Sequence, residues 1–114
     1  MRVRTSEWLD AAADLLERKG WARGGNHPTG KRCVTEALES TSPEWVADTR
    51  APVAYIARQI DPTISNYALG KSHGWAVVEC IEGWNNFDVD SAAEVIDTLR
   101  WAAKAAREDE RENE

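Results

Sequence analysis

The sequence predicts an all-α fold: a compact single domain of about five helices joined by short connections. Apolar residues recur at helical spacing in two long segments, one near each end of the chain, and no two segments between them have the pattern of paired strands. A length of 114 residues suits one domain with a single core. We therefore expect a helical domain over residues 1–107, followed by an acidic, frayed tail over residues 108–114.

The first helix is expected over residues 6–19, with Ser6 or Thr5 as its N-cap and Gly20 as its stop. Its apolar side chains form one stripe, which consists of Trp8, Leu9, Ala12, Leu15 and Leu16. A stripe of this width is typical of a helix that packs one side against a core.

The middle of the chain predicts shorter elements. Three glycines and a proline within residues 22–31 predict a loop, and short helices are expected over residues 32–40 and 52–60. Within residues 72–83, two adjacent valines favour a strand, but a strand without a partner is not stable. We therefore favour a helix there and expect the first and last helices to pack against it.

The C-terminal helix is predicted over residues 92–107, because Ser91 and Glu94 have the spacing of a capping box. In that motif the Ser91 hydroxyl accepts the Glu94 amide, and the Glu94 carboxylate accepts the Ser91 amide. The apolar stripe of this helix consists of Val95, Ile96, Leu99, Ala102, Ala103 and Ala106.

Trp84, Asn85 and Asn86 stand just before this helix start. Asn side chains can close a turn and satisfy the free carbonyl groups at a helix end, which gives these residues a structural role. In the alternative interpretation, the two side-chain amides beside the indole are contacts for a ligand.

Trp101 projects nearly opposite the centre of the C-terminal stripe, and helical spacing places it among Glu94, Asp97, Thr98 and Ala105. An exposed Trp beside acidic residues is a candidate interface anchor, for another protein or for a second copy of the chain. The alternatives are that another element covers this side or that the indole lies flat on the surface.

The net charge of −6 is unevenly distributed. Residues 1–32 hold seven Lys and Arg against four acids, a balance of +3, and the remaining residues hold seven against sixteen, a balance of −9. An acidic surface repels phosphate backbones, so direct nucleic-acid binding is not expected. No stretch approaches the roughly 18 apolar residues of a membrane span. We expect a cytoplasmic protein with reduced thiols and no membrane partner.

The loop that ends in Lys31 and Arg32 nearly matches the phosphate-binding pattern G-x-x-x-x-G-K-[ST]. Arg32 stands where that pattern requires a hydroxyl, and no strand precedes the loop, so nucleotide hydrolysis is not expected. Lys31 and Arg32 remain candidates for binding an anion at a helix start.

Metal binding and catalysis are not predicted. His27 with Cys33, and His73 with Cys80, are six and seven residues apart, which matches no common zinc pattern. A nucleophile would need a base and an orienting group, and none can be identified for either cysteine. We expect no metal site, no cofactor and no enzymatic activity.

Several segments together resemble a family of small actinobacterial and actinophage proteins that is catalogued as a domain of unknown function. The matching segments are Leu-Leu-Glu-Arg-Lys-Gly-Trp at residues 15–21, Cys33 with residues 36–38, and Trp84-Asn85-Asn86 before residues 91–96. The family has Asp where this chain has Asn86, which removes an ionic role at that position. The resemblance implies a small helical protein of phage or prophage origin, and it supplies no catalytic residues.

Three functions follow as hypotheses. The first is a non-catalytic protein-binding accessory factor, a phage-encoded modulator of a host protein that binds through Trp101 and the acidic C-terminal helix. The second is a small-molecule or anion-binding domain that uses the loop over residues 24–32. The third is an acidic nucleic-acid mimic that blocks a DNA-binding protein, which the charge of −9 after residue 32 suggests.

Overall fold

The computed structural model describes residues 4–22, 33–42, 50–61 and 81–112. Four α-helices lie within these ranges: α1 (Thr5–Lys19), α2 (Val34–Thr41), α3 (Arg50–Ile60) and α6 (Ala92–Glu112). A short π-helix, η2 (Trp84–Asp88), precedes α6. These residues contain no strand, and the prediction of an all-α fold is confirmed.

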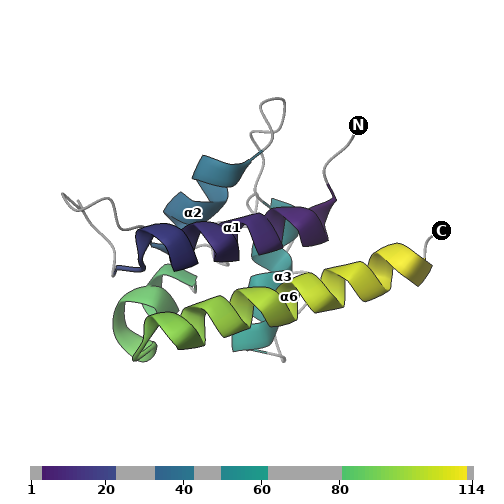
Figure 1. Ribbon diagram of the computed structural model, residues 1–114. Coiled ribbons are helices and arrows are strands. Elements are labelled where there is room, and N and C mark those ends of the chain that lie inside the picture. Colours follow the sequence, from purple (N-terminus) through teal and green to yellow (C-terminus); the bar gives the residue numbers. More distant parts are fainter. Residues whose placement is uncertain (1–3, 23–32, 43–49, 62–80, 113–114) are drawn as a thin grey trace.

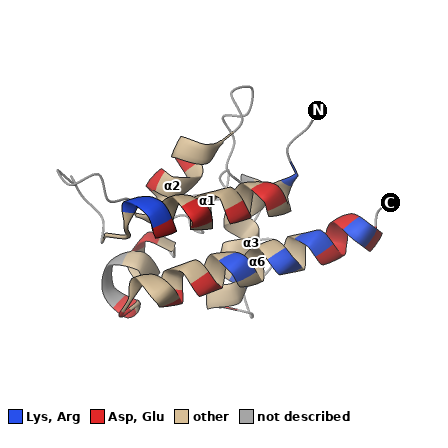
Figure 2. Cartoon of the chain, in the orientation of Figure 1, with Lys and Arg blue, Asp and Glu red and all other residues tan. Residues whose placement is uncertain are grey.

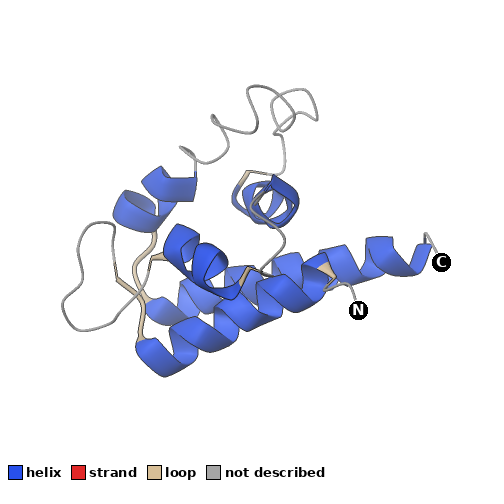
Figure 3. Ribbon diagram, turned by 90° about the horizontal axis from the view of Figure 1, so that it is seen from above, coloured by secondary structure: helices blue, strands red, loops and turns tan. Residues whose placement is uncertain are grey.

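Helices α1 and α6 run antiparallel, side by side, and form the most extensive contact between any two helices described (Figure 1). Helix α2 packs against α1, and α3 lies across α6 on its inner side (Figure 3). The Trp8 indole in α1 donates a hydrogen bond of 2.9 Å to the Leu38 carbonyl, which joins α1 to α2. The radius of gyration of 13.3 Å is close to the roughly 13 Å expected of a compact domain of this length.

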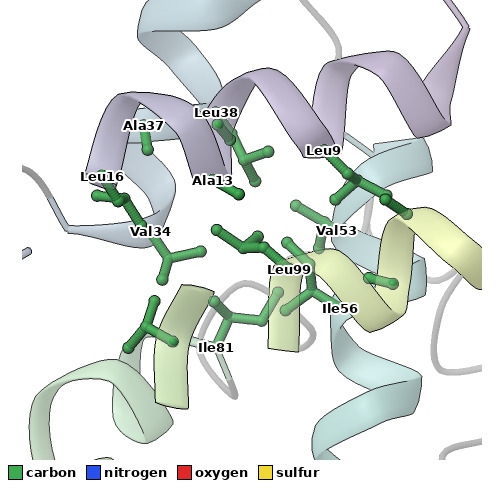
Figure 4. Packing of buried hydrophobic residues seen from close by; sticks show 14 of the residues in the cluster. Leu9, Ala13, Leu16, Val34, Ala37, Leu38, Val53, Ile56, Ile81 and Leu99 are labelled. Atoms are coloured by element: carbon green, nitrogen blue, oxygen red, sulfur yellow. The ribbon is translucent and has the colours of Figure 1, made fainter. Parts of the chain in front are cut away.

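The core lies where these helices meet (Figure 4). Both predicted stripes are confirmed: every member is buried except Leu15 and Ile96, which are partly buried and pack against the core. Ile81 is fully buried in the same core. Residues 81–83 are helical, as predicted, but the rest of the predicted helix over residues 72–83 lies outside the described residues.

Ion pairs border the contact between α1 and α6. The Arg100 guanidinium reaches three carboxylates of α1, at 2.9 Å from Asp10, 2.6 Å from Asp14 and 3.1 Å from Glu17. Arg107, two turns later, pairs with Asp10 at 2.7 Å. The hydrogen bond to Asp14 contributes most to raising the pKa of Arg100 above its ordinary value. Figure 2 shows acidic residues along α1 and basic residues along the neighbouring α6.

The starts of α1, α2 and α3 differ from the predicted ones, and α3 begins at Arg50, two residues before the predicted start. The N-cap of α1 is Arg4, whose backbone amide donates to the Glu7 carboxylate, so the predicted caps Thr5 and Ser6 are wrong. Helix α2 begins at Val34, after Cys33, instead of at Arg32. In α1 and α2 a Glu carboxylate in the first turn accepts a hydrogen bond from the backbone amide of the residue before the helix. This is one of the two hydrogen bonds of a capping box.

The predicted end of the C-terminal helix at Arg107 is wrong, because α6 continues to Glu112. Its last turns contact other helices. The Ser6 hydroxyl donates to Glu110 at 2.6 Å and the Ser6 amide donates to the same carboxylate at 3.2 Å. The Tyr55 hydroxyl donates to Asp109 at 2.6 Å. Residues 108–112 are therefore not a frayed tail, and residues 113–114 lie outside the described residues.

The Ser6–Glu110 contact predicts a large effect of a single truncation at the end of α6. Because Ser6 is buried, Glu110→Ala leaves its hydroxyl and amide without an acceptor, and we expect a loss of about 1–3 kcal/mol in the free energy of unfolding. The measurement is urea unfolding followed by circular dichroism. The matched control is Glu108→Ala, an exposed acid in the same turn, and equal losses in the two variants would contradict the contact.

Tyr55 predicts a loss of stability at high pH. Burial, followed by the hydrogen bond to Asp109, raises the pKa of Tyr55 from 10.0 to about 12. The stabilisation is complete below pH 10, where both states are protonated, and is lost as the pH rises from 10 to 12. Tyr55→Phe removes this titration, so the wild type should lose more stability than the variant over that range in urea unfolding. Parallel pH curves would refute the assignment.

Candidate functional site

The outward side of α6 carries an exposed indole. Trp101 is 58% exposed, and no other large hydrophobic side chain in the described part of the chain is exposed to this degree. The prediction that it points away from the apolar stripe is confirmed, and none of the described helices covers it. The side chains that helical spacing places around it define what we call the Trp101 face, namely Glu94, Asp97, Trp101, Lys104, Ala105 and Glu108.

Packing on both sides of α6 fixes this orientation. Arg100 points to the acids of α1 on one flank, and Asp109 meets Tyr55 of α3 on the other. The residues that face the core are buried between these flanks, and the side opposite the core is open to solvent. Trp101 lies on that side because its position is about 150° around the helix from the centre of the stripe.

One predicted member of the face is placed elsewhere. Thr98 is only 6% exposed, and its hydroxyl donates to the Glu94 carbonyl at 2.8 Å, so its prediction as a partner contact is wrong. Ala105 is half-buried at the edge, while Glu94 and Asp97 are exposed as predicted.

The charges on the face differ from those of α6 as a whole. Arg100 and Arg107 face α1 and pair with its carboxylates, so they do not contribute to the outward surface. Lys104 and Glu108 do contribute, since both are exposed. The sequence prediction missed these two residues, although their spacing of three and seven from Trp101 would have identified them.

The capping residues before α6 are confirmed with one difference. The Ser91 hydroxyl accepts the Glu94 amide at 3.2 Å, as expected of the capping box. The Glu94 carboxylate, however, accepts the amide of Asp90 at 3.3 Å instead of the amide of Ser91. Glu94 therefore fixes the start of α6 and also contributes negative charge to the Trp101 face.

Asn85 joins three segments of the chain in the interior. Its side-chain oxygen accepts the Trp21 indole N–H at 2.7 Å and the Val34 amide at 3.3 Å, and its side-chain nitrogen donates to the Ala22 carbonyl at 3.5 Å. Asn85 and Trp84 are buried, which favours the structural role predicted for them. Asn86 belongs to η2, and the structure describes its backbone but not its side chain.

The other sequence candidates are mostly beyond the described ranges. Lys31, Arg32, His27, His73 and Cys80 all lie outside them. Cys33 is buried, and burial raises the pKa of its thiol, which disfavours the reactive thiolate. Among the described residues, no group of three or more His, Cys, Asp or Glu side chains is placed to hold a metal ion. None of the described helices combines the length and apolar character needed to cross a bilayer.

Comparison with known proteins identifies the family. The pattern of a family described as "Family of unknown function (DUF6197)" matches residues 1–105. The chain belongs to this family. The match covers α1 to α3, the turn with Asn85 and most of α6, including Trp101. No curated protein and no solved structure matches the chain.

The three hydrogen bonds of Asn85 predict that this side chain stabilises the fold. Asn85→Ala leaves the Trp21 indole and the Val34 amide without their acceptor, and we expect a loss of about 1–3 kcal/mol in urea unfolding. The control is Gln59→Ala, which removes an amide from an exposed position of α3 and should change stability by less than about 0.5 kcal/mol. An Asn85→Ala variant as stable as the control would show that Asn85 has no such role.

Proposed function

We propose that this protein is a non-catalytic accessory factor that binds another protein through the Trp101 face. The observation that supports the proposal is the exposed indole in the middle of a continuous helix, surrounded by charged side chains that form no part of the core. Trp is enriched among the residues that contribute most of the energy of protein interfaces.

The exposed indole provides enough apolar surface for a useful contact. Covering 58% of a side chain of about 250 Å² removes roughly 140 Å² from water, worth about 3–4 kcal/mol before the costs of association. The helix already holds the backbone of Trp101 in place, so binding orders only the side chain. A rigid aromatic anchor of this kind loses little conformational entropy when a partner covers it.

The biological setting of the proposal comes from the family resemblance of the sequence. On that basis we propose that the protein is encoded by a phage or prophage of an actinobacterium, acts in the cytoplasm and modulates a host protein. The anion-binding alternative depends on Lys31 and Arg32, outside the described residues, and it stays a prediction. The nucleic-acid mimic also stays a prediction, and steep weakening of partner binding by salt would favour it.

Substitution of Trp101 tests the proposed function. We expect Trp101→Ala to abolish capture of a partner from actinobacterial lysate while the free energy of unfolding changes by less than about 0.5 kcal/mol, since the side chain is mostly exposed. The control is Gln59→Ala, an exposed substitution on α3 that should leave capture unchanged. Light scattering of each purified protein reports self-association. Identical behaviour of wild type and Trp101→Ala in both assays would refute the proposal.

A further inference from the structure

The charges of the Trp101 face indicate what kind of surface it binds. We propose that its partner is a different protein that presents an apolar pocket bordered by Lys and Arg, and not a second copy of this chain. This inference rests on the proposed function and specifies the partner. The supporting observation is that Arg100 and Arg107 of α6 pair with acids of α1, whereas most of the charged residues around Trp101, on the other side of α6, are acidic.

On the inner side, Arg100 and Arg107 are paired with Asp10, Asp14 and Glu17 of α1. On the outer side, the exposed charges of the Trp101 face are three acids and one lysine, namely Glu94, Asp97, Glu108 and Lys104. Two of the four basic residues of α6, Arg100 and Arg107, are therefore committed to the fold, and Lys104 is the one base among the residues of the Trp101 face. The face presents an apolar centre with net negative charge around it, which is complementary to a basic surface with an apolar pocket.

A symmetric contact between two copies would bring these acids together. In an isologous pair the same patch meets itself. If two α6 helices cross antiparallel at Trp101, Glu94 of one copy faces Glu108 of the other, because each is seven residues from the indole. If they run parallel, each acid faces its own counterpart. In the antiparallel arrangement Lys104 of one copy lies about one residue's rise from Asp97 of the other, and this attraction offsets part of the repulsion. Because each face carries three acids and one lysine, two copies still bring like net charges together, and repulsion opposes both arrangements.

The face also sets the size of the partner surface. Glu94 and Glu108 are fourteen residues apart in one helix, which corresponds to about 21 Å. Trp101 lies midway between them. A matching surface carries one apolar pocket with basic groups on the order of 10 Å to each side of it.

Two peptide probes test this complementarity. The first is a fluorescein-labelled amphipathic helix of Leu and Lys, about 15 residues and therefore about 22 Å long, and the second has Glu in place of every Lys. Each is titrated with the full-length protein in fluorescence anisotropy, and light scattering follows self-association of the protein alone. We expect the Lys peptide to bind at least about tenfold more tightly than the Glu peptide, and the protein alone to be monomeric.

Three variants determine whether binding occurs at the Trp101 face. We expect Trp101→Ala to weaken binding of the Lys peptide about tenfold or more, and the double variant Asp97→Asn, Glu108→Gln to weaken it about three- to tenfold. The matched control is Glu39→Gln, Glu82→Gln, which removes two exposed acids away from α6 and should change binding less than about twofold.

The outcomes separate this inference from the proposed function. Self-association that Trp101→Ala abolishes would overturn the inference but keep Trp101 as an interface residue. Equal weakening by the two double variants would also overturn it, because binding would then follow net charge alone. Tighter binding of the Glu peptide than of the Lys peptide would overturn the inference, because the face would then prefer an acidic surface. Absence of both self-association and Trp101-dependent binding would overturn this inference and the proposed function together.

Discussion

The antiparallel contact between α1 and α6 determines where the other described elements can lie. Each helix buries a stripe against the other, and α2 and α3 then cover the remaining apolar surface of α1 and α6 respectively. Arg100 fixes the register, because it reaches Asp10, Asp14 and Glu17, which lie on successive turns of α1. These pairs are partly exposed, so each contributes little to the free energy of folding, but together they favour one alignment over its neighbours.

Hydrogen bonds between segments far apart in the sequence add to the apolar contact between α1 and α6. Ser6 and Glu110 are 104 residues apart. Their hydrogen bond joins the last turns of α6, whose sequence is mostly charged, to a buried side chain at the start of α1. The Glu110 carboxylate also lies at the positive end of the α1 dipole, where a negative charge is favourable. Asn85 likewise joins distant segments, because its side chain accepts hydrogen bonds from the Trp21 indole and the Val34 amide. In each case a polar group that burial would otherwise penalise is satisfied from a distant part of the chain.

The sequence predicted the features that depend on periodicity and missed those that depend on distant partners. The stripes of α1 and α6, the start of α6 after Ser91 and the outward position of Trp101 follow from spacing along one helix. The end of α6 does not, because residues 108–112 are charged and only the contacts of Asp109 and Glu110 explain their helix. Thr98 was misplaced because its hydroxyl can bond the carbonyl four residues earlier, which lets a polar side chain lie against the core.

The side chains that stabilise the fold and the residues proposed to bind a partner lie on opposite sides of α6. The inner side cannot change without loss of the core or of the pairs with α1, whereas Trp101 contributes to neither. In an exposed helical position Trp is a weaker helix former than Ala by up to about 0.7 kcal/mol, so folding alone gives no reason for an indole there. The same pairs that align α6 turn Arg100 and Arg107 toward α1, and they leave more acids than bases around the indole. The packing of the fold therefore creates the charge pattern of the face on which recognition would depend.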